Sequence, residues 1–163
     1  MNVYTIREFT ISDQEGILDA IIELQDYERT LENDRLPGAT IAEKHMEYML
    51  RQCADKNGKI FVAAISDLIA GFVCVWADEE FGEHYAEPSK AGFVSDLVVR
   101  RTYRRSGIGR ALLEAAEDFL RSQGLEMVHL CVLVRNESAR KFYQEVGYRE
   151  YEVVVVKNLI QDK

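Results

Sequence analysis

The sequence predicts a single α/β domain in which helices flank a mixed β-sheet. Two observations carry this prediction. The 163 residues are 47% apolar and include only two prolines, a composition that suits one hydrophobic core without a linker. Strand-like and helix-like runs also follow one another in the order β-α-α-β-β-β-α-β-α-β, and the later strand–helix–strand unit predicts one right-handed crossover. We therefore expect a single domain over 1–163.

The first part of the chain predicts a strand and two helices. The alternating run "VYTIREFT" at 3–10 predicts the first strand. Apolar residues at helical spacing, preceded by a polar N-cap, predict a helix over 13–29. After a loop at 33–40, a second helix is expected from position 40 to about 54, and "DKNGK" at 55–59 predicts a turn.

Three strands are predicted next. Short apolar runs rich in β-branched and aromatic residues indicate strands at 60–65, 69–78 and 92–100. The turn "SDLIAG" joins the first two into a hairpin. The acidic segment 78–90 separates that hairpin from the third strand.

The remainder of the chain predicts two helices and two strands. Apolar residues on one face predict a helix over 107–122, and a shorter helix is expected over 137–146. Between them, the largely apolar run at 125–134 predicts a strand that is buried on both faces. The last strand is expected at 148–159, and the four valines at 153–156 could belong to the core or to a dimer interface.

Composition and charge exclude several classes of function. The net charge of −8 argues against nucleic acid as a partner. No apolar run approaches the roughly 18 residues that cross a bilayer, and the first residues do not resemble a signal peptide, so we expect a cytoplasmic protein without membrane association. The three cysteines form no CxxC pair, which predicts neither a disulfide framework nor a metal site. Cys74 and Cys131 lie in apolar runs and are expected in the core.

The stretch "RRTYRRSGIGRALL" at 100–113 predicts an anion site. It lies between a strand and the start of a helix, where free backbone N–H groups and the helix dipole favour phosphate. Gly107 and Gly109 let a ligand approach the backbone, and Arg104 and Arg105 add guanidinium groups that suit phosphate. The stretch is not a Walker A loop, because no lysine follows the glycines, and it lacks the third glycine of a dinucleotide fingerprint.

Two motifs at this spacing resemble the GNAT N-acetyltransferase superfamily. The string "RRSGIG" at 104–109 matches that family's acetyl-CoA signature, (Q/R)xxGx(G/A), and "RNESARKFYQEVGY" at 135–148 matches its second motif. The resemblance covers nearly the whole chain, since "YTIREFTISD" resembles the usual start of the fold. It implies a mixed sheet of roughly six to seven strands flanked by about four helices, in which neighbouring strands splay apart to form the acyl-CoA cleft.

The resemblance also implies how acetyl-CoA binds. Backbone amides of the loop would hold its diphosphate, groups on the preceding strand would bind the pantetheine arm, and the 137–146 helix would line the thiol end. The residues so implied are Leu97, Val98, Val99, Arg104, Arg105, Ser106, Gly107, Ile108, Gly109, Arg110, Asn136, Ala139 and Tyr143.

A finer resemblance concerns the acceptor. "IIELQDYERTLE" at 21–32 and "SDLVV" at 95–99 resemble the diamine (spermidine/spermine) acetyltransferase branch. The sequence keeps Asp96 but has Ser95 where that branch has its catalytic glutamate. The residues expected to bind the acceptor substrate are Tyr27, Glu28, Glu80, Glu83, His84 and Ser95.

Acetyl transfer from a thioester to an amine needs an acid, an oxyanion donor and a base. Tyr143, from the second motif, is the candidate acid because a phenol is protonated at neutral pH. A backbone N–H near Val98 is the candidate donor to the oxyanion. Strand alternation points Asp96 away from Ser95. The candidates for the base are Asp96, Glu80, Glu83 and His84.

The predicted function is that of an acetyl-CoA-dependent N-acetyltransferase, which transfers the acetyl group directly to the primary amine of a small molecule in a ternary complex. The acidic segment 78–90 favours a cationic acceptor. Two alternatives stay open: a protein acetyltransferase acting on an N-terminus or a lysine, and an acyl-CoA-binding module without catalysis. The resemblance also implies a homodimer, because this family often dimerises through its C-terminal strands.

Overall fold

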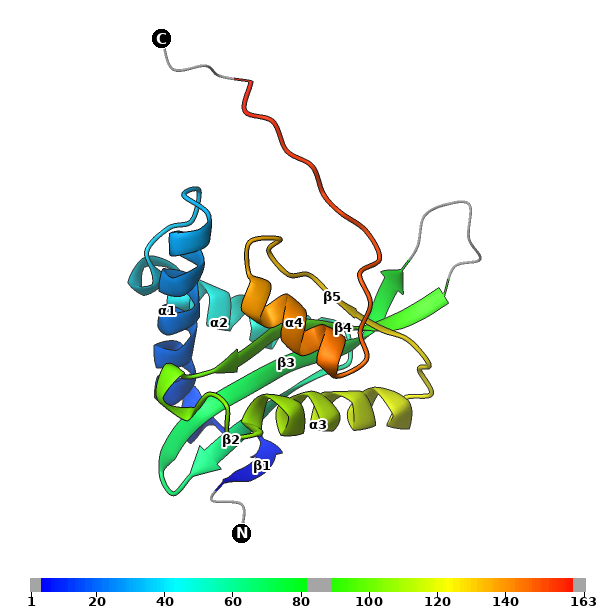
Figure 1. Ribbon diagram of the computed structural model, residues 1–163. Helices are drawn as coiled ribbons and strands as arrows, with labels where there is room; N and C mark the ends of the chain where they lie inside the picture. The colour runs from blue at the N-terminus through cyan, green and yellow to red at the C-terminus, as the bar shows by residue number, and fades with distance from the viewer. Residues whose placement is uncertain (1–3, 82–88, 160–163) are drawn as a thin grey trace.

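The computed structural model describes residues 4–81 and 89–159. Within this part of the chain, five strands form one sheet, and helices cover both of its faces (Figure 1). The predicted α/β class is therefore confirmed. The strands are, in their order across the sheet, β1 (Thr5–Glu8), β2 (Gly58–Ile65), β3 (Leu68–Phe81), β4 (Ser89–Val99) and β5 (Val128–Leu130).

The four helices of the described chain lie within a few residues of their predicted ranges. They form where apolar residues recur at helical spacing, and their bounds are α1 (Gln14–Leu31), α2 (Gly38–Asp55), α3 (Ile108–Ser122) and α4 (Glu137–Glu145). A short 3₁₀ turn at Ile11–Asp13 leads into α1.

The sheet is mixed, as predicted. Strands β1 to β4 pair as an antiparallel series, whereas β4 and β5 pair in parallel. A parallel pair needs a crossover connection, and α3 provides it between β4 and β5. The start of α3 therefore lies at the C-terminal end of β4.

Two hydrophobic layers hold the helices on the sheet. Helices α1 and α2 pack on one face, where they contribute Ile17, Ile21, Met46 and Met49 to a cluster with Phe72 and Trp76 of β3. Helix α3 packs on the other face through Leu112, Leu113, Ala116 and Leu120, and side chains of α4 lie against that second cluster. Cys74 is buried in the first layer, as expected.

Two predictions about the last part of the chain are wrong. The strand expected at 125–134 shortens to β5, whose side chains are only partly buried. The strand expected at 148–159 pairs with no strand among the described residues, so the sheet has five strands rather than six to seven. This segment instead runs away from the sheet (Figure 1), and the valines at 153–156 are exposed and outside the core. Because β-branched residues favour a strand through contacts with neighbours, a valine run alone does not fix one.

An ion pair fixes the first strand to the first helix. The Arg7 guanidinium on β1 donates two hydrogen bonds of 2.7 Å to the Asp13 carboxylate, which also accepts a bond of 2.8 Å from the Thr10 backbone N–H. The hydrogen bonds from Arg7 lower the pKa of Asp13 to about 2, although burial acts in the opposite direction. Bidentate geometry and a buried carboxylate make this pair stronger than an exposed one.

We predict that Asp13→Asn lowers the free energy of unfolding by about 1–2 kcal/mol near neutral pH, because the charge-assisted bonds are lost. A depressed pKa means that this stabilisation is present above the unfolded-state pKa and is lost as the pH falls towards the folded value of about 2. Urea unfolding at about pH 7 and about pH 3 should therefore show a smaller difference between wild type and variant at the lower pH. Asp118→Asn, on the exposed surface of α3, is the control, and an equal effect from both variants would contradict the prediction.

Candidate active site

A bulge in β4 shapes the site. Val94 pairs with Val75 and Asp96 pairs with Cys74, so Ser95 is one extra residue in β4. A bulge interrupts the alternation of side chains along a strand. The side chains of Ser95 and Asp96 accordingly reach the same pocket, and the Ser95 hydroxyl donates a hydrogen bond of 2.6 Å to Asp96 Oδ2. The expectation that Asp96 points away from Ser95 is therefore wrong.

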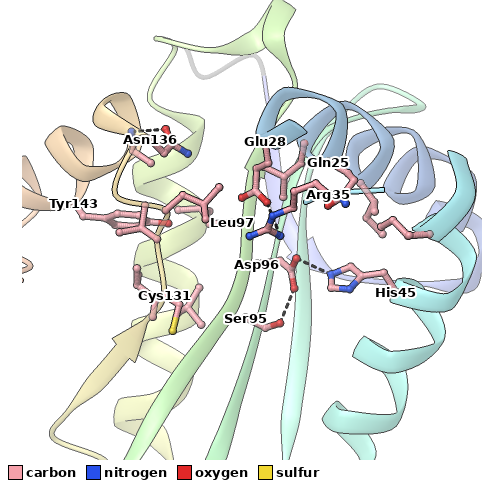
Figure 2. A pocket seen from close by; sticks show the side chains of 18 residues that line it. Gln25, Glu28, Arg35, His45, Ser95, Asp96, Leu97, Cys131, Asn136 and Tyr143 are labelled. Atoms are coloured by element: carbon pink, nitrogen blue, oxygen red, sulfur yellow. Dashed lines mark hydrogen bonds and ion pairs between the residues drawn. The ribbon is translucent and has the colours of Figure 1, made fainter. Parts of the chain in front are cut away.

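The pocket lies where β4 and β5 part. Their parallel pairing reaches Val94 and Leu130 and is not continued beyond them in the described chain. A pocket of about 370 Å³ follows, lined by Leu97 from β4 and by Val132 from the segment after β5. Helices α1 and α2 close one side of it, and α4 closes the other (Figure 2). The strands β4 and β5 thus separate, as the family resemblance predicted for neighbouring strands.

Along β4 beyond the bulge, the backbone hydrogen-bonding groups point alternately towards β3 and towards the side where β5 has departed. The Arg100 N–H donates a bond of 2.9 Å to Ala70 O on β3. Because hydrogen-bonding groups of an antiparallel strand alternate in direction, those of Val98 also point towards β3. The groups of Leu97 and Val99 point the other way, towards the β5 side. A backbone donor to an oxyanion is thus better supplied by Leu97 than by its neighbour Val98.

One wall of the pocket carries charged side chains. Asp96, whose side chain is 7% exposed, accepts a bond at Oδ1 from His45 Nε2 at 2.8 Å. Glu28 of α1 pairs with Arg35 at 3.0 Å, and burial raises the pKa of Glu28 against the lowering effect of Arg35. The hydrogen bond with Asp96 raises the pKa of His45 above its ordinary value. Figure 2 shows Asp96 between Ser95 and His45.

Sequence reasoning missed His45 and Arg35. A helical pattern could have found the first, because His45 lies three residues after Ala42 and four before Met49, both of which are buried on α2. Arg35 lies in the loop between α1 and α2, and its pairing with Glu28 depends on how that loop folds, which no local pattern indicates.

The opposite wall carries Tyr143 and Asn136. Burial raises the pKa of Tyr143 to about 12, and the nearby Asp96 charge adds to the effect. Asn136 caps α4, since its Oδ1 accepts a bond of 3.2 Å from the Ala139 N–H. Ala139 also lines the pocket. Cys131, expected in the core, is exposed and lines the pocket instead, because the segment after β5 leaves the sheet.

Tyr27 lies between the glycine–arginine loop and α4. Its hydroxyl is 3.5 Å from Asn136 Oδ1, and the Arg104 guanidinium lies over its ring at 5.6 Å. Tyr27 therefore contacts the glycine–arginine loop and the start of α4, and its expected role in binding the acceptor stays a prediction. Of the other expected acceptor residues, Glu28 and Ser95 line the pocket. Glu83, His84 and the side chain of Glu80 lie outside the described residues.

The loop before α3 has the backbone of an anion site. Gly107 adopts a left-handed conformation with φ of 85°, and Arg105 has φ of 65°. The Ala111 N–H donates to Gly107 O at 3.1 Å as the first turn of α3 closes, so the amides just before it have no partner within the helix. The buried side chain of Ile108 anchors this turn in the core. These features fit a bound diphosphate.

Gly109 brings the loop close to two other parts of the site. A methyl group placed on it would lie 3.5 Å from the Val99 side chain and 3.6 Å from the ring of Phe142 on α4. Arg104 is also fixed to the end of β4, because its Nε donates to Val99 O at 3.0 Å. Ser106 and Arg110 belong to the same loop and first turn.

In the described ranges, histidine, cysteine and acidic side chains form no group of three or more that could hold a metal ion. None of the helices there is long and apolar enough to cross a membrane.

Comparison with known proteins identifies the family. A model of the acetyltransferase (GNAT) family matches residues 23–148. An uncharacterized N-acetyltransferase of Methanocaldococcus jannaschii is 27% identical over 157 residues, which cover 94% of this chain and 64% of that protein. An aminoglycoside N(6')-acetyltransferase of Stenotrophomonas maltophilia is 28% identical over 117 residues, which cover 70% of this chain and 74% of that protein.

A solved structure shares the fold. A tetramutant of a Bacillus halodurans protein is 21% identical, with a TM-score of 0.82 over 95% of this chain and 99% of that chain. Two of the curated relatives are covered over only 54% and 64% of their own length. The family match contains both the glycine–arginine loop and the motif at 135–148, and it spans well over half of the residues. The chain belongs to the acetyltransferase (GNAT) family.

Proposed function

We propose that the protein is an acetyl-CoA-dependent N-acetyltransferase that acts on the primary amine of a small cationic molecule by direct transfer in a ternary complex. The observation that carries this proposal is the gap beyond the Val94–Leu130 pair. Beyond that pair lies a pocket with an acidic wall and a tyrosine opposite, and β4 continues from the pocket towards the loop before α3, whose backbone suits an anion. The family to which the chain belongs supports the reaction class.

The cofactor would lie along β4 and reach the start of α3. Amides from Arg104 to Arg110 would hold the diphosphate, aided by the guanidinium groups of Arg104 and Arg105. The backbone groups of Leu97 and Val99 would bind the pantetheine arm in the manner of a neighbouring strand. Asn136 and Ala139 would border the thiol end from α4.

Acetyl-CoA, when bound, supplies the thioester whose acetyl group is transferred. The Leu97 N–H would donate to the acetyl oxygen as negative charge develops on it. Tyr143 would donate its phenolic proton to the departing thiolate, and its raised pKa of about 12 keeps that proton in place at neutral pH. Holding both reactants in one pocket contributes further, because it removes the entropy of their encounter.

The acceptor would enter from the acidic wall. Glu28 and Asp96 are two carboxylates in one pocket, and each is a suitable partner for an ammonium group. The aminoglycoside acetyltransferase among the relatives acts on a small cationic molecule, which supports the same class here. The diamine branch is a weaker guide, because Ser95 replaces its glutamate and Tyr27 contacts the cofactor loop rather than the acceptor pocket.

A homodimer is part of this proposal. The exposed valines at 153–156 form an apolar run that a second copy of the chain would bury. Sedimentation should then show a dimer that Val154→Asp with Val156→Asp converts to a monomer, and an unchanged sedimentation coefficient would contradict the dimer.

The proposed reaction is tested by incubating the protein with acetyl-CoA and a panel of amines. The panel contains spermidine, sisomicin and a peptide with a free N-terminus, and the measurement is the release of free thiol over time. We expect turnover with the cationic small molecules. Turnover with the peptide alone would indicate a protein acetyltransferase, and tight binding of acetyl-CoA without thiol release would indicate a binding module.

We predict that Tyr143→Phe lowers kcat by about 10²–10⁴-fold while the dissociation constant of coenzyme A stays the same, because only the proton donor is lost. Tyr148→Phe is the matched control, since the Tyr148 hydroxyl bonds to Glu117 at 3.0 Å, outside the pocket. Thiol release and calorimetric titration give the two readouts. Full activity in the Tyr143 variant would remove the tyrosine from the mechanism.

Gly107 allows a test of the glycine–arginine loop. Gly107→Val should weaken coenzyme A binding by about tenfold or more, because a side chain disfavours the left-handed backbone that presents the amides. Gly124→Val is the control: that glycine also has a positive φ, of 76°, but it follows α3 at the other end. Both variants should lose similar stability in thermal melts. Calorimetry should show weak binding only for Gly107→Val, and equal binding by the two would be evidence against the loop.

A further inference from the structure

Three polar side chains form a connected series on the acidic wall. The Ser95 hydroxyl donates to one oxygen of Asp96, at 2.6 Å, and His45 Nε2 bonds to the other oxygen at 2.8 Å. The Asp96 side chain is 7% exposed and that of His45 is 30% exposed, and both line the pocket. The imidazole is therefore more accessible than the carboxylate to which it bonds.

Direct transfer requires a group that takes a proton from the acceptor. An amine is an ammonium ion near neutral pH and cannot attack until it is deprotonated. Tyr143 is unsuited to this step, because burial keeps its proton bound. Both Asp96 oxygens already accept hydrogen bonds, and its side chain is only 7% exposed, so Asp96 is less available to the acceptor than His45 is. A histidine has an ordinary pKa of about 6.5, near the pH at which a general base works best.

We propose that His45 is the catalytic base of the transfer and that Asp96 positions its ring. The inference rests on the proposed acetyltransferase function and supplies the proton acceptor that the sequence motifs leave unassigned. Ser95 takes part by holding the second oxygen of Asp96, so the serine that replaces a glutamate in the diamine branch has a role of its own.

The transfer begins from a neutral His45 ring and a protonated amine. In the neutral ring, Nε2–H donates to Asp96, which leaves the lone pair of Nδ1 free to accept. An ammonium N–H bond breaks, and its proton moves to Nδ1 directly or through one water. The freed lone pair of the amine forms the N–C bond as the C–S bond breaks, and the thiolate takes the phenolic proton of Tyr143. The acylated nitrogen then gives its surplus proton to the resulting tyrosinate, directly or through water, which leaves a neutral amide and restores the phenol. His45 then returns its proton to solvent.

The groups around the ring favour the charged form. Asp96 reaches it from β4 and accepts a bond from Ser95 on its other oxygen, Glu28 acts on it from α1, and Arg35 pairs with Glu28 from the following loop. Tyr48 stacks on it from α2, with ring centroids 6.0 Å apart. The bond to Asp96 raises the pKa of His45, burial lowers it, and the balance lies above the ordinary value. Activity should consequently fall as the pH decreases through this raised pKa, because the base is then already protonated.

Glu28 is a second carboxylate on this wall, and its surroundings suit a different task. Burial raises the pKa of Glu28, but its carboxylate is already paired with Arg35 at 3.0 Å, and a carboxylate can hold a cation through charge-assisted hydrogen bonds without taking up its proton. Glu28 is therefore better suited to attract the ammonium group than to deprotonate it.

The test compares His45→Gln with wild type, using acetyl-CoA with spermidine and with sisomicin. The glutamine can still bond to Asp96 but cannot take up a proton. We expect kcat to fall about 10²–10⁴-fold, the KM for acetyl-CoA to stay within about twofold, and the acidic limb of the kcat/KM profile to vanish. His129→Gln is the control, because His129 lies on β5 outside the pocket lining. Added imidazole should restore part of the activity of His45→Ala.

Asp96→Asn gives an independent readout by NMR titration of the His45 ring. The pKa of the ring should be lower in this variant than in wild type, and the acidic limb should move to lower pH in the same direction. This variant also serves if His45→Gln fails to fold. The inference about His45 would be wrong if His45→Gln had the kcat and pH profile of wild type, or if Asp96→Asn left the pKa of the His45 ring unchanged. Either result would leave the proposed acetyltransferase function standing. A wild-type protein that releases no thiol with any amine overturns the proposed function.

Discussion

The departure of β5 from β4 is the constraint on which the rest of the site depends. The parallel pairing stops at Val94 and Leu130, immediately before the extra residue in β4. Backbone hydrogen-bonding groups that lose a neighbouring strand must find other partners, because buried unpaired groups are costly. An extended ligand arm can satisfy them. The nearby bulge turns Asp96 into the pocket, so the proposed places for the cofactor arm and for the acceptor lie along one short stretch of β4.

In the proposed reaction, the two walls of the pocket have opposite tasks: one would give a proton and the other would accept one. Burial keeps the Tyr143 proton bound, whereas a hydrogen bond to Asp96 strengthens His45 as a base. Such a divergence of pKa values between neighbouring groups is what acid–base catalysis requires. The groups come from different elements, α4 on one side and α2 with β4 on the other, so the packing of helices on the sheet sets the distance between acid and base.

Local patterns sufficed for some of the molecule but not for all of it. The apolar period of α3 predicted that helix, and the glycines before it predicted a tight loop at its start, since each depends on residues adjacent in sequence. The bulge could not be predicted, because it is defined only by the register between β3 and β4. His45 reaches Asp96 across 51 positions, and no motif spans that separation. The segment after α4 has strand-like residues, yet no strand forms in it, because pairing partners decide strand formation.

The pocket draws its two halves from different stretches of the chain. Residues that would handle the acyl carrier come from β4 onward, whereas Glu28, Arg35 and His45 come from α1, α2 and the loop that links them. Apart from Tyr27, which contacts Arg104 of the loop, the N-terminal helical pair could therefore diversify in sequence while the residues proposed to bind the carrier stay the same. The choice of acceptor would then depend mainly on α1 and α2. Exchanging these two helices between homologues would be a rational way to change which amine is acetylated.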